Sequence, residues 1–282
     1  MLIDAHTHIF PPEMRQKRKT LVFQDPGFRG IYANKNAKMA KAEEIIEMLD
    51  KEQIDKAVVF GFPWQDAELC RQGNDYVLES MARFPGRLIG FITLPWDNTN
   101  AVLRECERGL AAGSMGVGEL ALYHQPLGKK AFEKVALLAQ MTEKQGVPLL
   151  LHINEPVGHD YAGKGVIDFQ ALQHFISAHP DLTIILAHWG GGFFFYELMP
   201  EIQKMSKNVF YDTAASPFLY RSRIYDAALK IVGEDRLLFG SDYPLLPPSR
   251  YFKEIETAVL SEKVRDKIKG ENARRLFSHS LS

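Results

Sequence analysis

The chain alternates eight times between a short apolar run and a longer segment with helical periodicity, and this rhythm limits the folds open to it. The apolar runs predict strands at residues 1–5, 57–60, 88–94, 115–120, 148–151, 182–187, 209–211 and 236–239. The longer segments predict helices at residues 41–51, 68–84, 101–112, 129–145, 168–178, 195–206, 221–232, 251–260 and 262–277. Such alternation is typical of parallel βαβ units.

We expect the eight units to close into a (β/α)8 barrel, an α/β fold of the TIM type. Near-continuous apolar strands fit a sheet that is covered on both faces, and a chain of 282 residues is close to the roughly 250 typical of this barrel. No Gly/Ser-rich linker divides the chain, so we expect one domain over residues 1–282. Residues 10–36 lack a regular period and predict a long loop, either a lid over a pocket or a contact with a second subunit.

The composition argues against polyanionic and membrane partners. The formal net charge is −1, and residues 15–19 (RQKRK) are the only dense basic stretch. No segment has the ~18 unbroken apolar residues of a membrane span, and the apolar opening predicts a core strand rather than a signal peptide. Cys70 and Cys106 provide no disulfide framework and suit a reducing cytoplasm. We therefore expect a cytoplasmic protein with a small-molecule substrate, with assembly into a homo-oligomer left open.

Nitrogen and oxygen ligands stand at five of the predicted strand ends. They are His6, His8, Glu119, His152, His188 and Asp242. His6 and His8 are two residues apart, so an extended backbone points both imidazoles the same way. In a barrel of this kind the chemistry lies at the C-terminal ends of the strands. Imidazole and carboxylate groups bind zinc-class cations, and the pattern predicts a divalent metal site, for Zn²⁺ first and Mn²⁺ as the alternative.

The number of ions depends on the role of Glu119. A single ion would lower the pKa of a bound water toward ~7, and Asp242 is the candidate that accepts its proton. Two ions about 3.5–4 Å apart would need a bridging carboxylate, and Glu119 is the candidate for that role. Glu119 would otherwise form a hydrogen bond to a ligating histidine. One or two ions therefore remain open.

Further residues beside these strand ends are candidates for substrate contacts. They are Trp64, Trp189, Tyr243 and His124. The glycines at 190–192 lack the Lys-Ser/Thr of a phosphate-binding loop, and we expect them to let the backbone pass close to the metal or the substrate. Asp212 ends the seventh predicted strand and is a further candidate for the barrel mouth, unless it pairs with a histidine or caps a turn.

The histidines of the first, fifth and sixth strands and the aspartate of the eighth resemble the pattern of the amidohydrolase superfamily in order and position. Residues 187–191 (AHWGG) and 238–244 (LFGSDYP) are similar to its metal-dependent hydrolase branch, amidohydrolase family 2. That branch also contains decarboxylases such as aminocarboxymuconate semialdehyde decarboxylase. Residues 272–277 (NARRLF) are similar to the closing helix of the branch, so the resemblance covers essentially the whole chain.

The resemblance implies that His6, His8, His152 and Asp242 hold a single zinc-like ion. His188 would then polarise the substrate or orient the attacking water, and in a two-metal member it would bind the second ion. Many two-metal members carry a carboxylated lysine on strand four, where this chain has Glu119, as TatD-like nucleases do.

The leading hypothesis is a metal-dependent hydrolase of a small amide, lactone or ester. Metal-activated water would attack the carbonyl, Asp242 would move the proton and the metal would stabilise the oxyanion. One alternative is a non-oxidative decarboxylase of an aromatic or muconate-type acid, with Arg15, Arg18 or Arg29 as the cation that holds a substrate carboxylate. The others are a TatD-like phosphodiesterase or nuclease and a non-enzymatic barrel that keeps a metal for stability.

Overall fold

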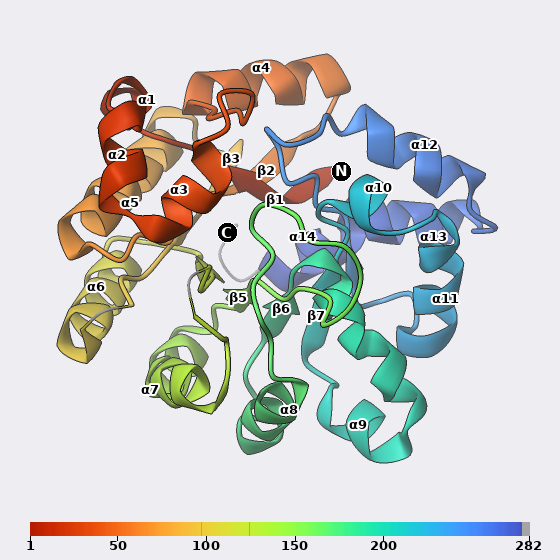
Figure 1. Ribbon diagram of the computed structural model, residues 1–282. Coiled ribbons are helices and arrows are strands. Elements are labelled where there is room, and N and C mark those ends of the chain that lie inside the picture. Colours follow the sequence, from red (N-terminus) through yellow and green to blue (C-terminus); the bar gives the residue numbers. More distant parts are fainter. Residues whose placement is uncertain (97, 124, 278–282) are drawn as a thin grey trace.

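The computed structural model of the protein describes residues 1–96, 98–123 and 125–277 and shows a barrel of eight parallel strands (Figure 1). The strands are β1 (Ile3–His8), β2 (Lys56–Phe60), β3 (Leu88–Ile92), β4 (Gly116–Leu120), β5 (Leu149–Leu151), β6 (Ile184–Leu186), β7 (Val209–Asp212) and β8 (Leu237–Leu238). Each strand pairs with the next along the chain. The Ala5 amide donates to the Phe239 carbonyl oxygen at 2.8 Å, which joins β1 to the end of β8. The expected (β/α)8 barrel is confirmed.

Helices lie around the barrel and at its two ends (Figure 1). They are α1 (Pro12–Gln16), α2 (Arg18–Gln24), α3 (Pro26–Tyr32), α4 (Ala42–Glu52), α5 (Ala67–Arg83), α6 (Thr99–Ala111), α7 (Lys129–Gln145), α8 (Phe169–Ala178), α9 (Pro200–Met205), α10 (Ser216–Leu219), α11 (Arg223–Val232), α12 (Ser249–Thr257), α13 (Glu262–Asp266) and α14 (Asn272–Phe277). A run of 3₁₀ turns, η1 (His188–Leu198), follows β6, and a π-helical turn, η2 (Lys267–Glu271), precedes α14. No helix among the described residues is both long enough and apolar enough to cross a membrane.

Strand residues alternate between two apolar layers, as extended backbone requires. Val58 and Phe60 of β2 belong to the cluster inside the barrel, where Ala273 and Phe277 of α14 also pack. The intervening residues, such as Val59, belong to the cluster between the strands and the surrounding helices. Because both faces are covered, the strands read as continuous apolar runs in the sequence.

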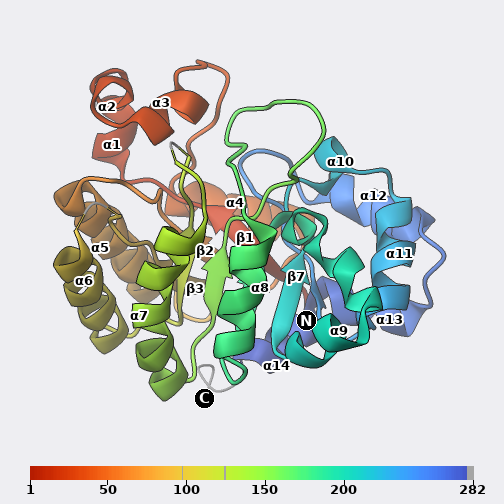
Figure 2. The ribbon, with the colours of Figure 1, turned by 60° about the horizontal axis from the view of Figure 1, so that its bottom comes forward.

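The prediction of a single irregular loop over residues 10–36 is wrong, because this stretch contains α1, α2 and α3. Each of these helices is one or two turns long, too short to show a helical period in the sequence. They are held instead by an apolar cluster in which Phe10, Leu21 and Phe28 pack on Phe62 and Trp64 of the segment after β2. Figure 2 shows α1–α3 and the loop between β5 and α8 on the same side of the barrel. A lid role for this region stays a prediction.

Two predicted helices are broken in the structure. The expected helix at 195–206 divides into η1 and α9, with Pro200 at the first position of α9, where its missing N–H costs nothing. The expected helix at 262–277 divides into α13, η2 and α14 around Gly270. A Cβ on Gly270 would lie 2.0 Å from the carbonyl oxygen of Met1, so the close approach of the first residues requires glycine there.

Gly118 is the position of β4 at which substitution should cost most. Its φ is +141°, and a Cβ would lie 2.4 Å from the Leu150 carbonyl oxygen of β5. We expect Gly118→Ala to lower the free energy of unfolding by about 3 kcal/mol, since a backbone clash adds to an unfavourable φ. Gly86→Ala is the matched control, because its φ of +75° is also unfavourable but no atom lies within 4 Å of the new Cβ. Urea denaturation curves measure both, and equal losses in the two variants would contradict the packing argument.

Candidate metal centre at the barrel mouth

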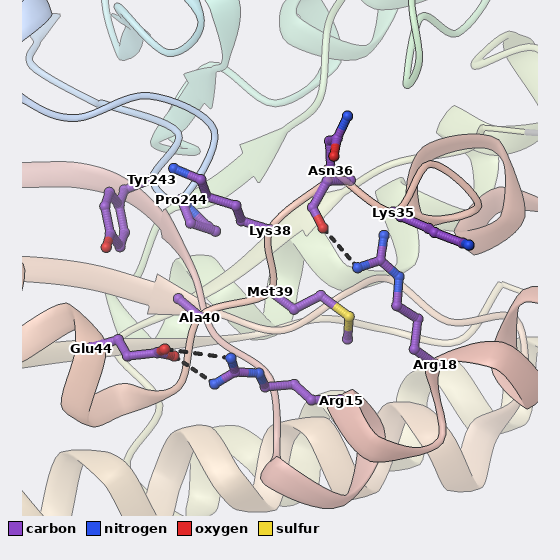
Figure 3. Close-up of a pocket in the computed structure, with 11 residues that line it drawn as sticks. Arg15, Arg18, Lys35, Asn36, Lys38, Met39, Ala40, Glu44, Tyr243 and Pro244 are labelled. Carbon is purple, nitrogen blue, oxygen red and sulfur yellow. Dashed lines mark hydrogen bonds and ion pairs between the residues drawn. The ribbon is translucent and has the colours of Figure 1, made fainter.

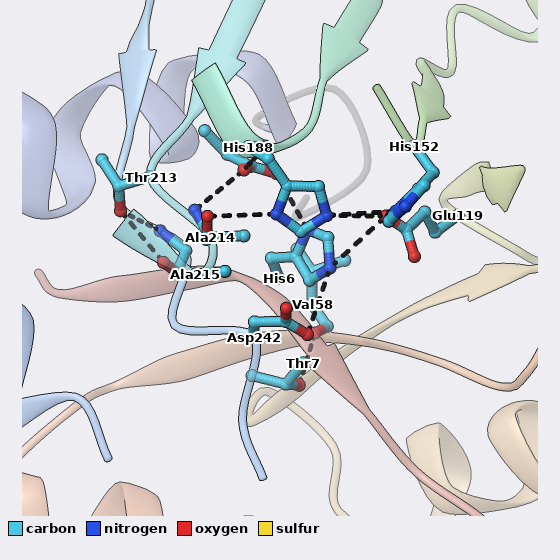
Figure 4. Close-up of polar contacts among 12 residues, drawn as sticks. His6, Thr7, Val58, Glu119, His152, His188, Thr213, Ala214, Ala215 and Asp242 are labelled. Atoms are coloured by element: carbon cyan, nitrogen blue, oxygen red, sulfur yellow. Dashed lines mark hydrogen bonds and ion pairs between the residues drawn. The ribbon is translucent and has the colours of Figure 1, made fainter. Parts of the chain in front are cut away.

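The six predicted ligands meet at one end of the barrel. Figure 4 shows five of them, His6, Glu119, His152, His188 and Asp242. His6 and His8 come from β1, Glu119 from β4, and the other three from the residues that follow β5, β6 and β8. The pairing of β1 with β2 shifts register between Asp4 and Thr7, and that of β4 with β5 shifts between Val117 and Leu120. Such irregularities re-aim side chains near functional sites. Here Ile3 and Ala5 pack inside the barrel while His6 and His8 both approach the other ligands.

Glu119 is the centre of the cluster. One of its oxygens, Oε1, lies 2.7 Å from His152 Nδ1, 3.4 Å from His188 Nε2 and 3.8 Å from His6 Nε2. Its other oxygen lies 4.0 Å from His8 Nε2. The Glu119 side chain is buried, so its carboxylate depends on these imidazoles rather than on water.

Asp242 approaches the cluster from the opposite side. Its Oδ1 lies 3.0 Å from His8 Nε2 and 3.7 Å from His6 Nε2. The Asp242 amide donates to the His6 carbonyl oxygen at 2.9 Å, which fixes the backbone here in a left-handed conformation with φ of +57°. His188 has the same unusual backbone, with φ of +56°. Non-glycine residues in this conformation are strained and cluster at functional sites.

The donor set fits a divalent cation. Three overlapping groups of ligand atoms lie within 4.8 Å of one another, formed by His6, His8 and Glu119, by His6, His188 and Asp242, and by Glu119, His152 and His188. His6 Nε2 is buried without a hydrogen-bond partner in the described structure. An orphaned imidazole nitrogen that faces two carboxylates is what a metal ligand would leave when the ion is removed. Mixed nitrogen and oxygen ligands suit Zn²⁺ and Mn²⁺.

Asp212 orients two of the imidazoles. Its Oδ2 lies 2.9 Å from His6 Nδ1, and its Oδ1 accepts the backbone N–H groups of His188 and Ala214 at 2.9 and 3.0 Å. His188 Nδ1 lies 3.0 Å from the Ala214 carbonyl oxygen. With a proton on each Nδ1, both rings would present an unprotonated Nε2 to a bound metal ion. Of the roles considered for Asp212, the structure shows the pairing with a histidine, and Asp212 does not line the cavity at the mouth.

Without an ion the cluster balances its charge with protons. Burial favours neutral forms, yet the surrounding imidazoles hold the pKa of Glu119 well below its usual range. Burial likewise opposes charge on His6, but Asp212, Glu119 and Asp242 together raise its pKa to about 10. For His188 burial is outweighed by Glu119 and Asp242, and its pKa rises to about 9. A metal ion would take the place of these protons.

A cavity of about 370 Å³ opens above the cluster. His8, Glu119, His152, His188 and Asp242 lie in its lining. The remaining walls come from loops and from α3 and α10 at the barrel mouth, and they are rich in aromatic side chains. They include Tyr32, Phe62, Tyr123, Tyr161 and Phe218. A flat organic molecule fits such a space better than a polyanion.

The structure does not support the three predicted substrate contacts that it describes. Trp64 is fully buried and stacks on Phe28 with ring centroids 4.6 Å apart, so it supports the cavity wall from behind. Trp189 is also fully buried, where its Nε1 donates to Ser216 Oγ at 3.0 Å. Tyr243 lines a neighbouring cavity rather than this one. The position of these residues beside strand ends predicts that they lie near the mouth, but it does not predict the direction in which each ring points. His124 lies outside the described residues.

The glycine run after His188 allows a close backbone approach, as expected, but to another strand end. A Cβ on Gly191, whose φ is +57°, would lie 2.2 Å from the Asn154 carbonyl oxygen. Sequence reasoning missed Asn154 and Tyr161 as cavity residues and Lys38 as a charged one. It also missed Asp4, whose buried carboxylate accepts the Ser241 backbone N–H at 2.9 Å and so fixes the turn before Asp242.

We expect Asp212→Asn to weaken Mn²⁺ or Zn²⁺ binding by about 10–100-fold, the usual cost of losing a group that orients a ligand. The amide keeps an oxygen for the two backbone donors but presents an N–H to His6 Nδ1, which moves the imidazole proton to Nε2. His159→Ala is the control, because His159 lines the cavity but is not part of the ligand cluster. Its ring centroid lies 5.7 Å from that of Tyr161. Titration calorimetry measures both, and an Asp212→Asn protein with unchanged affinity would contradict this role.

Metal affinity should also rise with pH. Because the pKa of His6 is about 10 and that of His188 about 9 without metal, an entering ion displaces protons at neutral pH. Lowering the pH from 8 to 6 then strengthens the competing protons and weakens binding. Dissociation constants across this range, with proton release measured in buffers of different ionisation enthalpy, check the sign. Binding that is independent of pH would contradict it.

The sequence is similar to characterised decarboxylases. Over 257 residues it is 28% identical to gamma-resorcylate decarboxylase of Rhizobium radiobacter, covering 74% of this chain and 76% of that protein. It is 24% identical to 2-amino-3-carboxymuconate-6-semialdehyde decarboxylase of Dictyostelium discoideum, covering 96% of this chain and 90% of the relative. These relatives overturn the hydrolase hypothesis, because each is named for loss of CO2 rather than for hydrolysis.

Solved structures agree on the fold. A 5-carboxyvanillate decarboxylase from Sphingomonas paucimobilis matches with a TM-score of 0.76 at 18% identity, over 98% of both chains. A dihydroxybenzoic acid decarboxylase from Polaromonas, solved with bound manganese and the inhibitor 2-nitroresorcinol, matches with a TM-score of 0.73 at 19% identity, over 100% of this chain and 98% of that one. Manganese is the metal named there, so the expectation of zinc finds no specific support.

The family model described as amidohydrolase matches residues 3–278, which include all six residues of the cluster. The fold, the cluster at the mouth and this match agree, and the chain belongs to the amidohydrolase family.

Proposed function

We propose that the protein is a metal-dependent, non-oxidative decarboxylase of an aromatic or muconate-type carboxylic acid, with Mn²⁺ as the preferred ion. The observation that carries the proposal is the position of the ligand cluster in the floor of an aromatic-walled cavity. The proposal is also supported by the sequence similarity to gamma-resorcylate and aminocarboxymuconate semialdehyde decarboxylases.

The reaction sets three demands on such a cavity. The bond between the carboxylate carbon and the carbon skeleton breaks, CO2 leaves and the electron pair stays on the skeleton. A proton then takes the place of CO2 at that carbon. The site must therefore position the acid, offset the charge that develops on the skeleton and supply one proton.

Residues of the cluster formed by His6, His8, Glu119, His152, His188 and Asp242 would hold the ion. A divalent cation bound there would supply positive charge that binds the oxygens of the acid and offsets the developing negative charge. Glu119 would be either a ligand or the carboxylate that orients His152, whose Nδ1 lies 2.7 Å from its Oε1. His188, held by the Ala214 carbonyl oxygen at 3.0 Å, would be a ligand or would bind an oxygen of the acid.

The aromatic walls would position a flat substrate. Phe62 and Tyr123 stack with centroids 5.6 Å apart and planes 21° from parallel, which gives one continuous apolar surface. Tyr123 also meets the His152 ring edge-on at 5.1 Å, so this surface extends down to the cluster. A planar acid that packs on it would present its carboxylate to the ligands and exclude water from the breaking bond.

Asp242 would supply the proton. It lines the cavity, and beside the Oδ1 that faces His8 and His6 its carboxylate has a second oxygen that can carry a proton to a positioned carbon. Asp242, expected from the sequence to move the proton of an attacking water, would here deliver it to carbon.

The arginines considered for the substrate carboxylate lie elsewhere. Arg15 pairs with Glu44 at 2.6 Å, Arg18 donates to backbone carbonyl oxygens, and Arg29 is exposed on α3. In the described lining of the cavity Lys38 is the only lysine or arginine. A single cation gives little attraction for a nucleic acid, which argues against the nuclease alternative.

The test is CO2 release by Mn²⁺-loaded protein from 2,6-dihydroxybenzoate, 5-carboxyvanillate and aminocarboxymuconate semialdehyde, beside a panel of lactones, esters and amides. We expect CO2 from at least one acid and no hydrolysis. Glu119→Gln should lower the rate by roughly 100-fold through loss of the central carboxylate. Glu133→Gln, an exposed change on α7, is the matched control. Hydrolysis without CO2 release, or equal activity in both variants, would refute the proposal.

A further inference from the structure

Lys38 is the only lysine or arginine in the described lining of the metal cavity. The same residue also lines a neighbouring cavity. The second cavity has a volume of about 410 Å³ and is lined in part by the segment between α3 and α4 (Figure 3). Ala37, Lys38 and Pro244 belong to the lining of both. Lys38 is exposed, and no hydrogen bond or ion pair of its ammonium group is present among the described residues. Its charge therefore faces the space above the metal cluster without a protein partner.

The two arginines of the second cavity, Arg15 and Arg18, form hydrogen bonds within the protein. Arg15 is paired with Glu44, whose Oε2 also accepts the Lys41 backbone N–H at 2.6 Å. Arg18 donates from Nε to the Tyr32 carbonyl oxygen at 2.9 Å and from Nη1 to that of Ala37 at 2.8 Å. These bonds hold the backbone just before Lys38, and the residues after it, Met39 and Ala40, are buried. Lys38 thus carries an exposed ammonium group on a backbone that is held on both sides.

We propose that Lys38 is a specificity residue that binds a second acidic group of the substrate, one that remains on the product. The preferred substrate would then be a dicarboxylic rather than a monocarboxylic acid. This inference rests on the proposed decarboxylase function and adds the substrate class to it.

Lys38 is poorly suited to hold the carboxylate that leaves. That group must lose its charge as it becomes CO2, and an ammonium bound to it would stabilise the starting state more than the transition state. An acidic group that keeps its charge is stabilised by the lysine equally in the bound substrate and in the transition state. The ion pair therefore lowers KM and raises kcat/KM without changing kcat. The partly solvated lysine can reach such a group without the cost of a buried unpaired charge.

The kinetic test compares 5-carboxyvanillate, which has two carboxylates, with 2,6-dihydroxybenzoate, which has one, on Mn²⁺-loaded protein. We expect Lys38→Ala to lower kcat/KM for the first acid about tenfold more than for the second, the loss of one charge-assisted hydrogen bond. The difference should lie in KM, and Lys38→Arg should restore most of it. Lys35→Ala is the matched control, since Lys35 lines only the second cavity, and it should leave the ratio unchanged.

A second readout separates this inference from the proposed function. Isophthalate and benzoate, titrated calorimetrically into Mn²⁺-loaded protein, report binding without turnover. The wild-type protein should bind isophthalate the more tightly, and Lys38→Ala should remove that preference. If no acid released CO2 the decarboxylase proposal would fail, while the titration would still decide the role of Lys38. Equal affinities in the wild type, or equal effects of Lys38→Ala on both acids, would overturn the inference.

Discussion

The buried carboxylate of Glu119 is the constraint on which the barrel mouth depends. A charge removed from water is costly unless other charges and hydrogen bonds compensate it, and Glu119 is almost wholly buried. Three imidazoles from three other strand ends lie within 4 Å of its Oε1. The ends of β1, β4, β5 and β6 are therefore held to one point, and a divalent ion there would satisfy the same carboxylate.

The rest of the mouth follows from that arrangement. Asp212 turns His6 and His188 so that their free nitrogens face the centre. Asp4 fixes the turn that carries Asp242. Around them α3, α10 and the segments after β2, β4 and β5 supply the aromatic walls of a cavity. The scaffold thus provides a rigid set of ligands, and the loops decide which molecule reaches it.

The barrel and the cluster could be predicted because both depend on regular spacing. Apolar runs mark the strands, and a polar residue at the carboxyl end of such a run lies at the barrel mouth. The direction of a ring outside regular structure has no such rule, which is why Trp64 and Trp189 were expected in the cavity and lie behind its wall. The short helices of residues 12–32 could not be predicted for the same reason. Tertiary packing stabilises them, and they are too short to show a helical period in the sequence.

The reaction could not be predicted from the ligands. Six nitrogen and oxygen ligands describe a cation and its charge, and the same charge assists attack by water or loss of CO2. The difference lies in whether water or a proton donor meets the substrate, and that depends on loop residues such as Tyr123 and Lys38, which no strand pattern reveals. The proposal of decarboxylation therefore rests on similarity to decarboxylases as well as on the cavity.

Anomalous diffraction at the manganese edge, from crystals grown with Mn²⁺, tests the central claim most directly. The account predicts a peak among His6 Nε2, Glu119 and Asp242, within bonding distance of their ligand atoms and absent from Glu119→Gln crystals. A peak elsewhere on the molecule, or none at the barrel mouth under saturating Mn²⁺, would contradict it.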